Sequence, residues 1–360
     1  MRYRPACAYI DLNALQHNLR VIKSKAPEAK ILAVVKANGY GHGINRVVRH
    51  LSQADGFGVA SLDEAMVLRQ QGFLHRILLL EGLFSEAELP LVAQNRLDIV
   101  VHSLYQLEWL LDFHCDCKLN VWIKIDSGMH RLGFSKEEFP QVLEQLEAVS
   151  DRYRLFTISH FSCADEDTLE AQEFTHKQLE TFYDLTDPLS YPKSIANSAG
   201  IIYYPQSHFD WVRPGIMLYG AGADPQDNLQ LKPVMRLESK LQALRWVKAG
   251  EPVGYGNCWT ASRKSLIGVV AIGYGDGYPR HARNGTPVLI NNRRVPLVGR
   301  VSMDMITVDL TDIEGEFNIG DTAVLWGDEQ LSVDEVAEYS GTIGYELLCG
   351  ITKRVTKIER

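Results

Sequence analysis

The chain has 360 residues, 46% hydrophobic and 23% charged, which is the composition of a globular protein large enough for two domains. Its 37 Lys and Arg residues against 45 Asp and Glu give a net charge of −8, which argues against nucleic-acid and anionic-membrane partners. No apolar run reaches the roughly 18 residues of a membrane span, and we expect no signal peptide after the basic N-terminus.

The first part of the chain alternates short apolar strands with amphipathic helices. Asp11 is expected to cap a first helix, in which Leu12, Leu15, Leu19 and Ile22 recur at helical spacing. Eight strands are expected at residues 31–35, 56–60, 77–80, 99–101, 119–125, 155–159, 194–196 and 209–212. Capping boxes are expected where Ser or Thr precedes Glu or Gln by three residues, at Ser61 and Glu64, Ser103 and Gln106, and Ser135 and Glu138.

Eight strand–helix units within about 220 residues predict a (β/α)8 barrel, in preference to an open doubly wound sheet. Functional side chains of such barrels lie at the C-terminal ends of the strands. In this chain those ends carry Lys36, Lys124, Arg131, His160, Ser198 and Arg213. The fold class is therefore α/β, with a barrel whose strand ends concentrate basic and polar groups.

Residues 224–228, which are polar and rich in turn formers, predict a domain boundary. We expect the barrel over residues 1–226 and a mainly β domain over residues 227–360, with residues 1–10 packing against the second domain. Strands are expected at 240–247, 265–272, 288–290, 295–298, 306–310 and 323–326, and a helix at 333–339. Asn291 and Asn292 predict a hairpin turn between two of these strands.

The six cysteines are too few for a disulfide framework in a chain of this length. Cys115 and Cys117 form a Cys-x-Cys pair without a matching second pair, so we expect no metal site. Free thiols are typical of a reducing cytoplasm, which is the location that we expect.

Lys36 follows a strand that is expected to be buried on both faces, and Gly39, Gly41 and Gly43 come directly after it. Burial disfavours the ammonium form of a lysine, whereas the glycines allow the backbone to approach a ligand closely. A desolvated amine beside such a loop suits a Schiff base with an aldehyde cofactor. The alternative is a lysine that only extends to solvent at the end of a strand.

Ser198 and the segment from Arg213 to Gly215 follow the last two strands of the barrel, where barrels often bind phosphate. A helix cap and a proline–glycine turn are the alternative interpretation. Lysine after strand one and a phosphate cradle after strands seven and eight together fit pyridoxal 5′-phosphate (PLP). Arg213 against the ring nitrogen would keep the ring unprotonated and favour simple proton exchange at Cα, whereas a salt-bridging arginine is the alternative.

Two further groups are expected at the same mouth. His160 could stack on a cofactor ring, or be a core histidine with satisfied nitrogens. Arg131 could bind a substrate carboxylate through two hydrogen bonds. Lys124 lies near it in the predicted barrel, and two neighbouring cations are unfavourable unless one is modified or neutral.

These segments resemble the alanine racemases, a family of fold-type III PLP enzymes, over essentially the whole chain. The motifs that carry the resemblance are VVKANGYGHG at 34–43, SGMHRLG at 127–133, NSA at 197–199, RPGI at 213–216, VGYG at 253–256, IGYGDGY at 272–278, GRVSMD at 299–304 and YE at 345–346. Ser302 stands where some relatives have cysteine, and Tyr274 and Tyr278 match the motif that lines the entrance.

The resemblance implies a homodimer with shared active sites and two catalytic bases, Lys36 for the D-alanine face and Tyr255 of the partner subunit for the L-alanine face. It assigns cofactor binding to Lys36, Tyr40, His160, Ser198, Arg213, Gly215, Ile216 and Tyr345. Arg131 and the backbone of Met303 would bind the substrate carboxylate. Family members often carry a carbamate at the position of Lys124, which would turn its charge negative and orient Arg131.

The function implied is the interconversion of L- and D-alanine, either to supply D-alanine for peptidoglycan or for alanine catabolism. A racemase with a broader range of amino acids is the alternative, although such enzymes often have a secretion signal. Fold-type III decarboxylases usually place a carboxylate at the ring nitrogen, where Arg213 is expected here. PLP-binding homeostasis proteins are single barrels, and the second domain with Tyr255 argues against that class.

Overall fold

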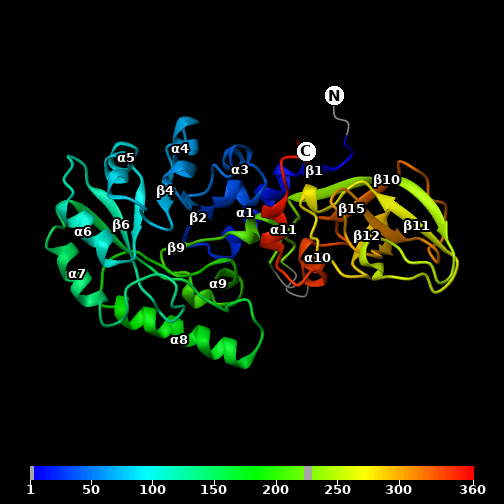
Figure 1. Cartoon of the computed structure of the whole chain (residues 1–360). Coiled ribbons are helices and arrows are strands. Elements are labelled where there is room, and N and C mark those ends of the chain that lie inside the picture. Colours follow the sequence, from blue (N-terminus) through cyan, green and yellow to red (C-terminus); the bar gives the residue numbers. More distant parts are fainter. Residues whose placement is uncertain (1–3, 223–228) are drawn as a thin grey trace.

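The structure is a computed structural model that describes residues 4–222 and 229–360. It has two parts that lie side by side, a barrel and a mainly β domain (Figure 1). The predicted boundary at residues 224–228 lies outside the described residues. None of the described helices combines the length and the apolar character that a membrane crossing requires.

The barrel contains the eight predicted strands, and every pairing between them is parallel. The strands are β2 Lys30–Val34, β3 Gly56–Val59, β4 Arg76–Leu79, β5 Asp98–Val101, β6 Leu119–Lys124, β7 Tyr153–Ile158, β8 Lys193–Ser194 and β9 Trp211–Val212. They follow the order β8-β7-β6-β5-β4-β3-β2-β9. The Ser194 hydroxyl donates a hydrogen bond to the Trp211 carbonyl (2.7 Å), which joins the two ends of the sheet. The barrel prediction is therefore confirmed.

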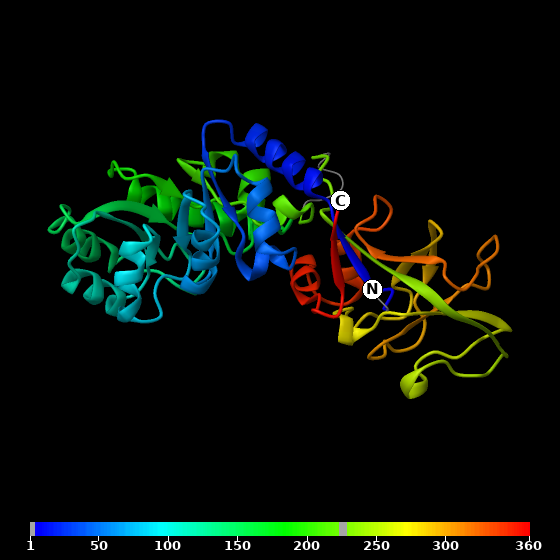
Figure 2. The same ribbon diagram turned by 90° about the horizontal axis from the view of Figure 1, so that it is seen from above.

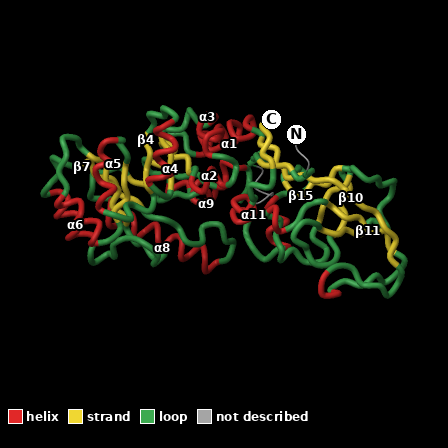
Figure 3. Tube along the Cα trace, turned by 45° about the horizontal axis from the view of Figure 1, so that its top comes forward, coloured by secondary structure: helices red, strands yellow, loops and turns green. Residues whose placement is uncertain are grey.

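Helices alternate with these strands and cover the outside of the barrel (Figure 3). The helical segments of this part of the chain, short ones included, are α1 Leu12–Lys25, α2 Lys36–Tyr40, α3 Ile44–His50, α4 Leu62–Gln70, η1 Glu86–Glu88, α5 Leu89–Gln94, α6 Leu104–Asp112, α7 Phe139–Glu147, α8 Leu169–Thr186, α9 Ser198–Tyr203, η2 Pro205–Ser207 and η3 Ile216–Tyr219. Asp11 caps α1 as predicted, because its carboxylate accepts hydrogen bonds from the amides of Asn13 and Ala14.

Only one of the three predicted capping boxes has the expected hydrogen bonds. Ser135 and Glu138 bond reciprocally, at 2.8 and 3.2 Å. The Ser61 and Ser103 hydroxyls make no capping bond, so these two predictions are wrong. Glu64 accepts instead from the backbone amides of Ala37 (2.7 Å) and Ala60 (2.9 Å), and the first of these bonds ties α4 to the segment after Lys36.

The interior of the barrel is packed with large side chains, including Trp122, Phe156 and Trp211. Buried Asp98 accepts hydrogen bonds from Arg76 (2.5 Å) and from the Trp122 indole (2.9 Å) within this cluster. A buried carboxylate needs such partners to offset its lost hydration. The packed interior gives the strand ends that carry the candidate site a rigid support.

The second domain is built on a sheet of antiparallel strands. Its strands are β10 Met235–Val247, β11 Ser265–Val270, β12 Pro287–Ile290, β13 Arg293–Pro296, β14 Ile306–Asp309 and β15 Thr322–Trp326. Asn291 and Asn292 join β12 and β13 with positive φ angles of 50° and 61°, so the predicted hairpin turn is confirmed.

Both ends of the chain also join this sheet. The sequence did not predict the strand at the C-terminus. Strand β1 (Cys7–Ile10) pairs antiparallel with β10 and parallel with β16 (Thr356–Glu359). The two terminal strands lie side by side where the barrel meets the second domain (Figure 2). Two short helices, α10 Val333–Tyr339 and α11 Gly344–Gly350, lie at the same junction (Figure 1), and α11 contacts α2 of the barrel.

Candidate active site

A cavity of about 600 Å³ opens at the C-terminal ends of the barrel strands. Nine of the twelve site residues predicted from the sequence line it, namely Lys36, Tyr40, Lys124, Arg131, His160, Ser198, Arg213, Gly215 and Tyr345. Ile216 is buried directly after Gly215. Tyr255 and Met303 are not among the lining residues.

The backbone holds Lys36 firmly at the rim of this cavity. The amides of Val34 and Val35 donate to the carbonyls of Pro214 and Gly58, both at 2.9 Å, so the strand pairing continues up to Lys36. The segment labelled α2 is a left-handed turn, because Ala37, Asn38 and Gly39 have φ angles of 51°, 56° and 63°. Such a conformation is unfavourable for residues other than glycine, and Glu64 supports it through the Ala37 amide.

Ser198, Gly215 and Tyr40, which also line the cavity, form a cradle of hydroxyl and backbone groups. The Ser198 hydroxyl accepts hydrogen bonds from the amides of Gly215 (3.0 Å) and Met217 (3.3 Å). A Cβ atom at Gly215 would overlap with the Tyr40 hydroxyl, so this hydroxyl lies directly against the bare Cα. The ring of Tyr345 lies 5.9 Å from that of Tyr40. Hydroxyl groups around an exposed backbone are a typical phosphate site.

An aromatic stack supports Tyr40 from behind. Its ring stacks on Tyr219 at 4.8 Å, and Tyr219 stacks on His42 at 4.6 Å. The Tyr219 hydroxyl donates to the Val34 carbonyl (3.2 Å), which connects the stack to the strand before Lys36. Burial lowers the pKa of His42 to about 4, so its imidazole is neutral within the stack.

Arg213 is buried and its guanidinium is held in place by several acceptors. It donates to the Ser194 hydroxyl (2.6 Å), the Ser159 carbonyl (2.5 Å) and His160 Nδ1 (3.2 Å). Burial lowers the pKa of Arg213 to about 9, so it remains a cation at neutral pH. Burial, and then the charge of Arg213, lower the pKa of His160 well below its usual value, so His160 is a neutral ring beside a fixed cation.

The cavity is rich in cationic groups. Burial, and then the charges of Arg213, Arg131 and Lys36, lower the pKa of Lys124 to about 7. Glu81 is the acidic residue among the described lining residues. This balance of charge suits a ligand that carries anionic groups.

Tyr255 and Met303 belong to exposed loops of the second domain. Their side chains are 70% and 52% exposed. The amides of Tyr274 and Gly275 donate to the carbonyls of Ser302 (3.0 Å) and Met303 (2.8 Å), so the loop that carries Met303 is joined to the loop that carries Tyr274. The chain therefore does not bring Tyr255 together with Lys36 by itself.

An ion network around the buried Asp276 joins the loop that carries Tyr274 to the loop that carries Met303. Asp276 is fully buried and pairs with Arg4 and Arg354, at 2.8 Å from Arg4 Nε and 3.2 Å from Arg354 Nε. Arg4 also donates to the Asp304 carbonyl (3.0 Å). The N-terminal segment thereby holds the loops of the second domain in position.

Glu81, Leu80 and Cys349 line the cavity although they were not predicted as site residues. Glu81 follows the end of β4, so its place after a barrel strand was a usable signal. Cys349 lies on α11, which reaches the barrel from the far end of the chain, and no local pattern indicates that contact.

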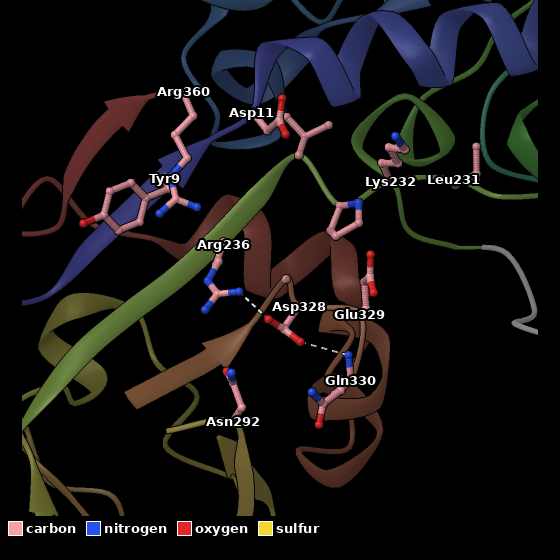
Figure 4. Close-up of a pocket in the computed structure, with 13 residues that line it drawn as sticks. Tyr9, Asp11, Leu231, Lys232, Arg236, Asn292, Asp328, Glu329, Gln330 and Arg360 are labelled. Atoms are coloured by element: carbon pink, nitrogen blue, oxygen red, sulfur yellow. Dashed lines mark hydrogen bonds and ion pairs between the residues drawn. The ribbon is translucent and has the colours of Figure 1, made fainter. Parts of the chain in front are cut away.

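Another cavity, of about 580 Å³, lies between the β1–α1 connection, the start of β10 and the turn after β15 (Figure 4). Several of its charged groups already have partners. Arg236 contacts Asp328, Asp328 accepts from the Gln330 amide (3.0 Å), and Arg360 lies over the Tyr9 ring (4.2 Å). None of the site residues predicted from the sequence lines this cavity, whereas nine of them line the cavity around Lys36, which is therefore the candidate active site.

Comparisons with known proteins agree with this geometry. The family model described as "Alanine racemase, N-terminal domain" matches residues 10–223, and "Alanine racemase, C-terminal domain" matches residues 234–359. A curated alanine racemase of Vibrio cholerae is 51% identical over 358 residues, which cover 98% of this chain and 97% of that protein. A curated alanine racemase of Shewanella baltica is 50% identical over 352 residues, 97% of each chain.

Solved structures give the same result. The biosynthetic alanine racemase of Pseudomonas aeruginosa superimposes with a TM-score of 0.95 at 48% identity, covering 99% of this chain and 100% of that one. The alanine racemase of Acinetobacter baumannii gives a TM-score of 0.90 at 40% identity, with the same coverage.

Proposed function

The chain belongs to the alanine racemase family, and we propose that it interconverts L- and D-alanine with PLP as its cofactor. The observation that carries the proposal is the convergence of Lys36, the Ser198–Gly215–Tyr40 cradle and Arg213 on one cavity. The relatives' names favour alanine over the broader range of amino acids considered from the sequence.

The residues of the cavity fit PLP. Lys36 would bind the aldehyde through its amine, and Ser198, Gly215, Ile216, Tyr40 and Tyr345 would hold the phosphate. The contact between the bare Cα of Gly215 and the Tyr40 hydroxyl supports this, because a side chain at that position would fill the cradle. When bound, PLP supplies an aldehyde that links to the amino acid and a ring that withdraws electrons from Cα.

Arg213 and His160 would set the electronic environment of the ring. Arg213 is a cation with no acceptor atoms, so it can donate a hydrogen bond to the ring nitrogen. It cannot accept a hydrogen bond from a protonated ring nitrogen, as a carboxylate would. A ring that stays unprotonated withdraws electrons moderately, which is sufficient for exchanging one proton. The neutral His160 would lie against the ring without competing for that nitrogen.

Racemisation requires one base on each face of the alanine Cα. Lys36 would remove or return the proton on the D-alanine face, and Tyr255 of the partner subunit would act on the L-alanine face. Arg131 and the backbone of Met303 of the partner subunit would hold the substrate carboxylate and so orient Cα between the two bases.

Lys124 is proposed to carry a carbamate formed with CO2. Because its pKa is lowered to about 7, a large part of the amine is neutral at physiological pH and able to react. The carbamate would replace a cation by an anion beside Arg131 and remove the repulsion among the cations of the cavity.

The proposed assembly is a homodimer in which each active site takes residues from both chains. The exposed loops of the second domain support this proposal, because Tyr255, Tyr274, Met303 and Met305 are 70%, 38%, 52% and 42% exposed. Neighbouring apolar side chains at this level of exposure are typical of a surface that another subunit covers.

We place the reaction in the cytoplasm, where D-alanine would serve peptidoglycan synthesis or alanine would be degraded. Cys115, Cys117, Cys163, Cys258 and Cys349 are free thiols, which fits a reducing compartment.

Exchange of the α-proton in D2O tests the proposal. L- and D-alanine are supplied separately, and the ratio of the two enantiomers is measured over time. Wild-type protein loaded with PLP should exchange the α-proton of both enantiomers and racemise them. Tyr255→Phe should stop racemisation and exchange of L-alanine, while exchange of D-alanine continues through Lys36. Wild-type protein that binds PLP at Lys36 but leaves alanine unchanged would overturn the proposed substrate.

A further inference from the structure

Two exposed thiols meet on a barrel loop that the racemisation chemistry does not use. Cys115 and Cys117 lie between α6 and β6, and the chain bends at Asp116 and Cys117. The two Sγ atoms are 3.2 Å apart, and the Cys115 thiol also donates to the Cys117 carbonyl (3.0 Å). The bend thus places the two sulfur atoms close enough for a disulfide bond, which has a length of about 2.05 Å, to form after a small movement.

The position of this loop separates it from the active site. Cys117 lies two residues before β6 begins at Leu119, whereas Lys124 at the other end of the same strand lines the cavity of the candidate active site. Residues 114–118 are all exposed, so small molecules can reach both thiols. The described residues contain no group of three or more His, Cys, Asp or Glu side chains arranged to hold a metal ion.

We propose that Cys115 and Cys117 are a dithiol modification site, which forms a reversible disulfide by exchange with a small-molecule disulfide such as glutathione disulfide. A thiolate of the pair attacks one sulfur of the small disulfide and releases one small thiol. The second thiolate then attacks the protein sulfur of the mixed disulfide and releases the other small thiol. Two cysteines are oxidised, one small disulfide is reduced, and the two cysteine protons end on the two small thiols.

The surroundings of Cys117 affect how readily its thiol ionises. Desolvation, then the hydrogen bond with Cys115, raise the pKa of the Cys117 thiol, and the Asp116 carboxylate adds to this shift. Whichever thiolate attacks the small disulfide first, the second attack is an intramolecular step, and the 3.2 Å between the two Sγ atoms already supplies its proximity.

The disulfide would be reversible and would add little stability. Only one residue separates the two cysteines, so closing this small ring removes little entropy from the unfolded chain. Its exposure also gives reductants access, and exposed disulfides are the readily reduced ones. The site is therefore suited to report the thiol–disulfide balance and not to hold the fold together.

Thiol trapping across a series of glutathione buffers tests the proposal with the holoenzyme. Samples of wild type, Cys115→Ser, Cys117→Ser and the double variant are quenched in acid, alkylated and digested. The masses of the resulting peptides are then measured by mass spectrometry. The wild-type peptide that contains both cysteines should lose two alkylation sites together, with the mass of an internal disulfide, and regain them with excess reduced glutathione. Each single variant should instead form a mixed disulfide with glutathione.

Three outcomes would overturn the proposal: both wild-type thiols staying alkylatable at every ratio, both ending as mixed disulfides, or the pair linking only separate chains. Phenylarsine oxide, which bridges two neighbouring thiols, gives a second measurement. One equivalent should protect Cys115 and Cys117 from alkylation in wild type but not the remaining cysteine of either single variant. Equal protection in wild type and single variants would contradict the pairing.

Discussion

The surroundings of Lys124 disfavour its positive charge. As a result, the stability of the native state depends on pH. Its pKa in the native state is about 7, against 10.5 for an ordinary lysine, because burial and three neighbouring cations disfavour the ammonium. Between these two values the unfolded chain binds more protons than the native state, so native stability rises with pH across this window. Below pH 7 the full cost of the buried cation is present.

Lys124→Met should therefore stabilise the protein most below pH 7, and the gain should vanish as the pH approaches 10.5. Urea unfolding in CO2-free buffers at the two ends of this range measures the difference between variant and wild type. Lys118→Met, at an exposed position just before the same strand, is the matched control and should show no such trend. A Lys124→Met effect that is the same at both ends would show that Lys124 is not a buried cation.

The residues of the site differ in how far the sequence could predict them. Four of them follow barrel strands, namely Lys36, His160, Ser198 and Arg213. Identifying the strands in the sequence is therefore sufficient to predict that these residues lie at the same end of the barrel. The partners that make Arg213 a fixed cation could not be predicted, because the Ser159 and Ile195 carbonyls come from neighbouring strands whose register only the fold determines.

At the scale of elements, the turn after Lys36 is held in an unfavourable backbone conformation and packed closely against its neighbours. Ala37, Asn38, Gly39 and Tyr40 all have positive φ angles, and Gly41 follows with φ of 78°. At Gly41 a Cβ atom would also overlap with the Leu348 carbonyl of α11. The turn and α11 are thus packed against each other without space for a side chain.

Gly41→Ala should destabilise the protein by more than about 3 kcal/mol, because strain and a backbone clash add. Gly72→Ala is the matched control, since Gly72 has a similar φ of 82° but no atom within 4 Å of the added Cβ, and it should cost about 1 kcal/mol. Urea unfolding gives both values, and PLP absorbance should show weakened cofactor binding only for Gly41→Ala. Equal losses in the two variants would show that the contact with α11 is unimportant.

The elements that the sequence predicted correctly are those with a strong local pattern. The barrel strands and the Asn291–Asn292 turn are examples, because apolar runs and turn residues act locally. The capping box at Ser61 failed because Glu64 binds the Lys36 turn instead, a contact between elements 27 residues apart. Strand β16 has mostly half-exposed residues, and it forms because β1 is beside it.

At the scale of the whole molecule, the single chain brings together the proposed cofactor cradle but not the two proposed bases. Lys36 lies in the barrel cavity, whereas Tyr255 is exposed on the second domain. No sequence pattern within one chain could place these two residues together, because the proposed contact runs between subunits. Only the family resemblance predicted it, and the exposure of the Tyr255 loop agrees with that expectation.

Subunit complementation is the measurement to make first. Lys36→Ala and Tyr255→Phe homodimers should each lack racemase activity, since every site in them has lost one base. After the two are mixed and allowed to exchange subunits, half of the dimers should be mixed, each with one intact site, which restores about a quarter of wild-type activity. A mixture that exchanges subunits but stays inactive would contradict a site in which Lys36 of one chain faces Tyr255 of the partner subunit.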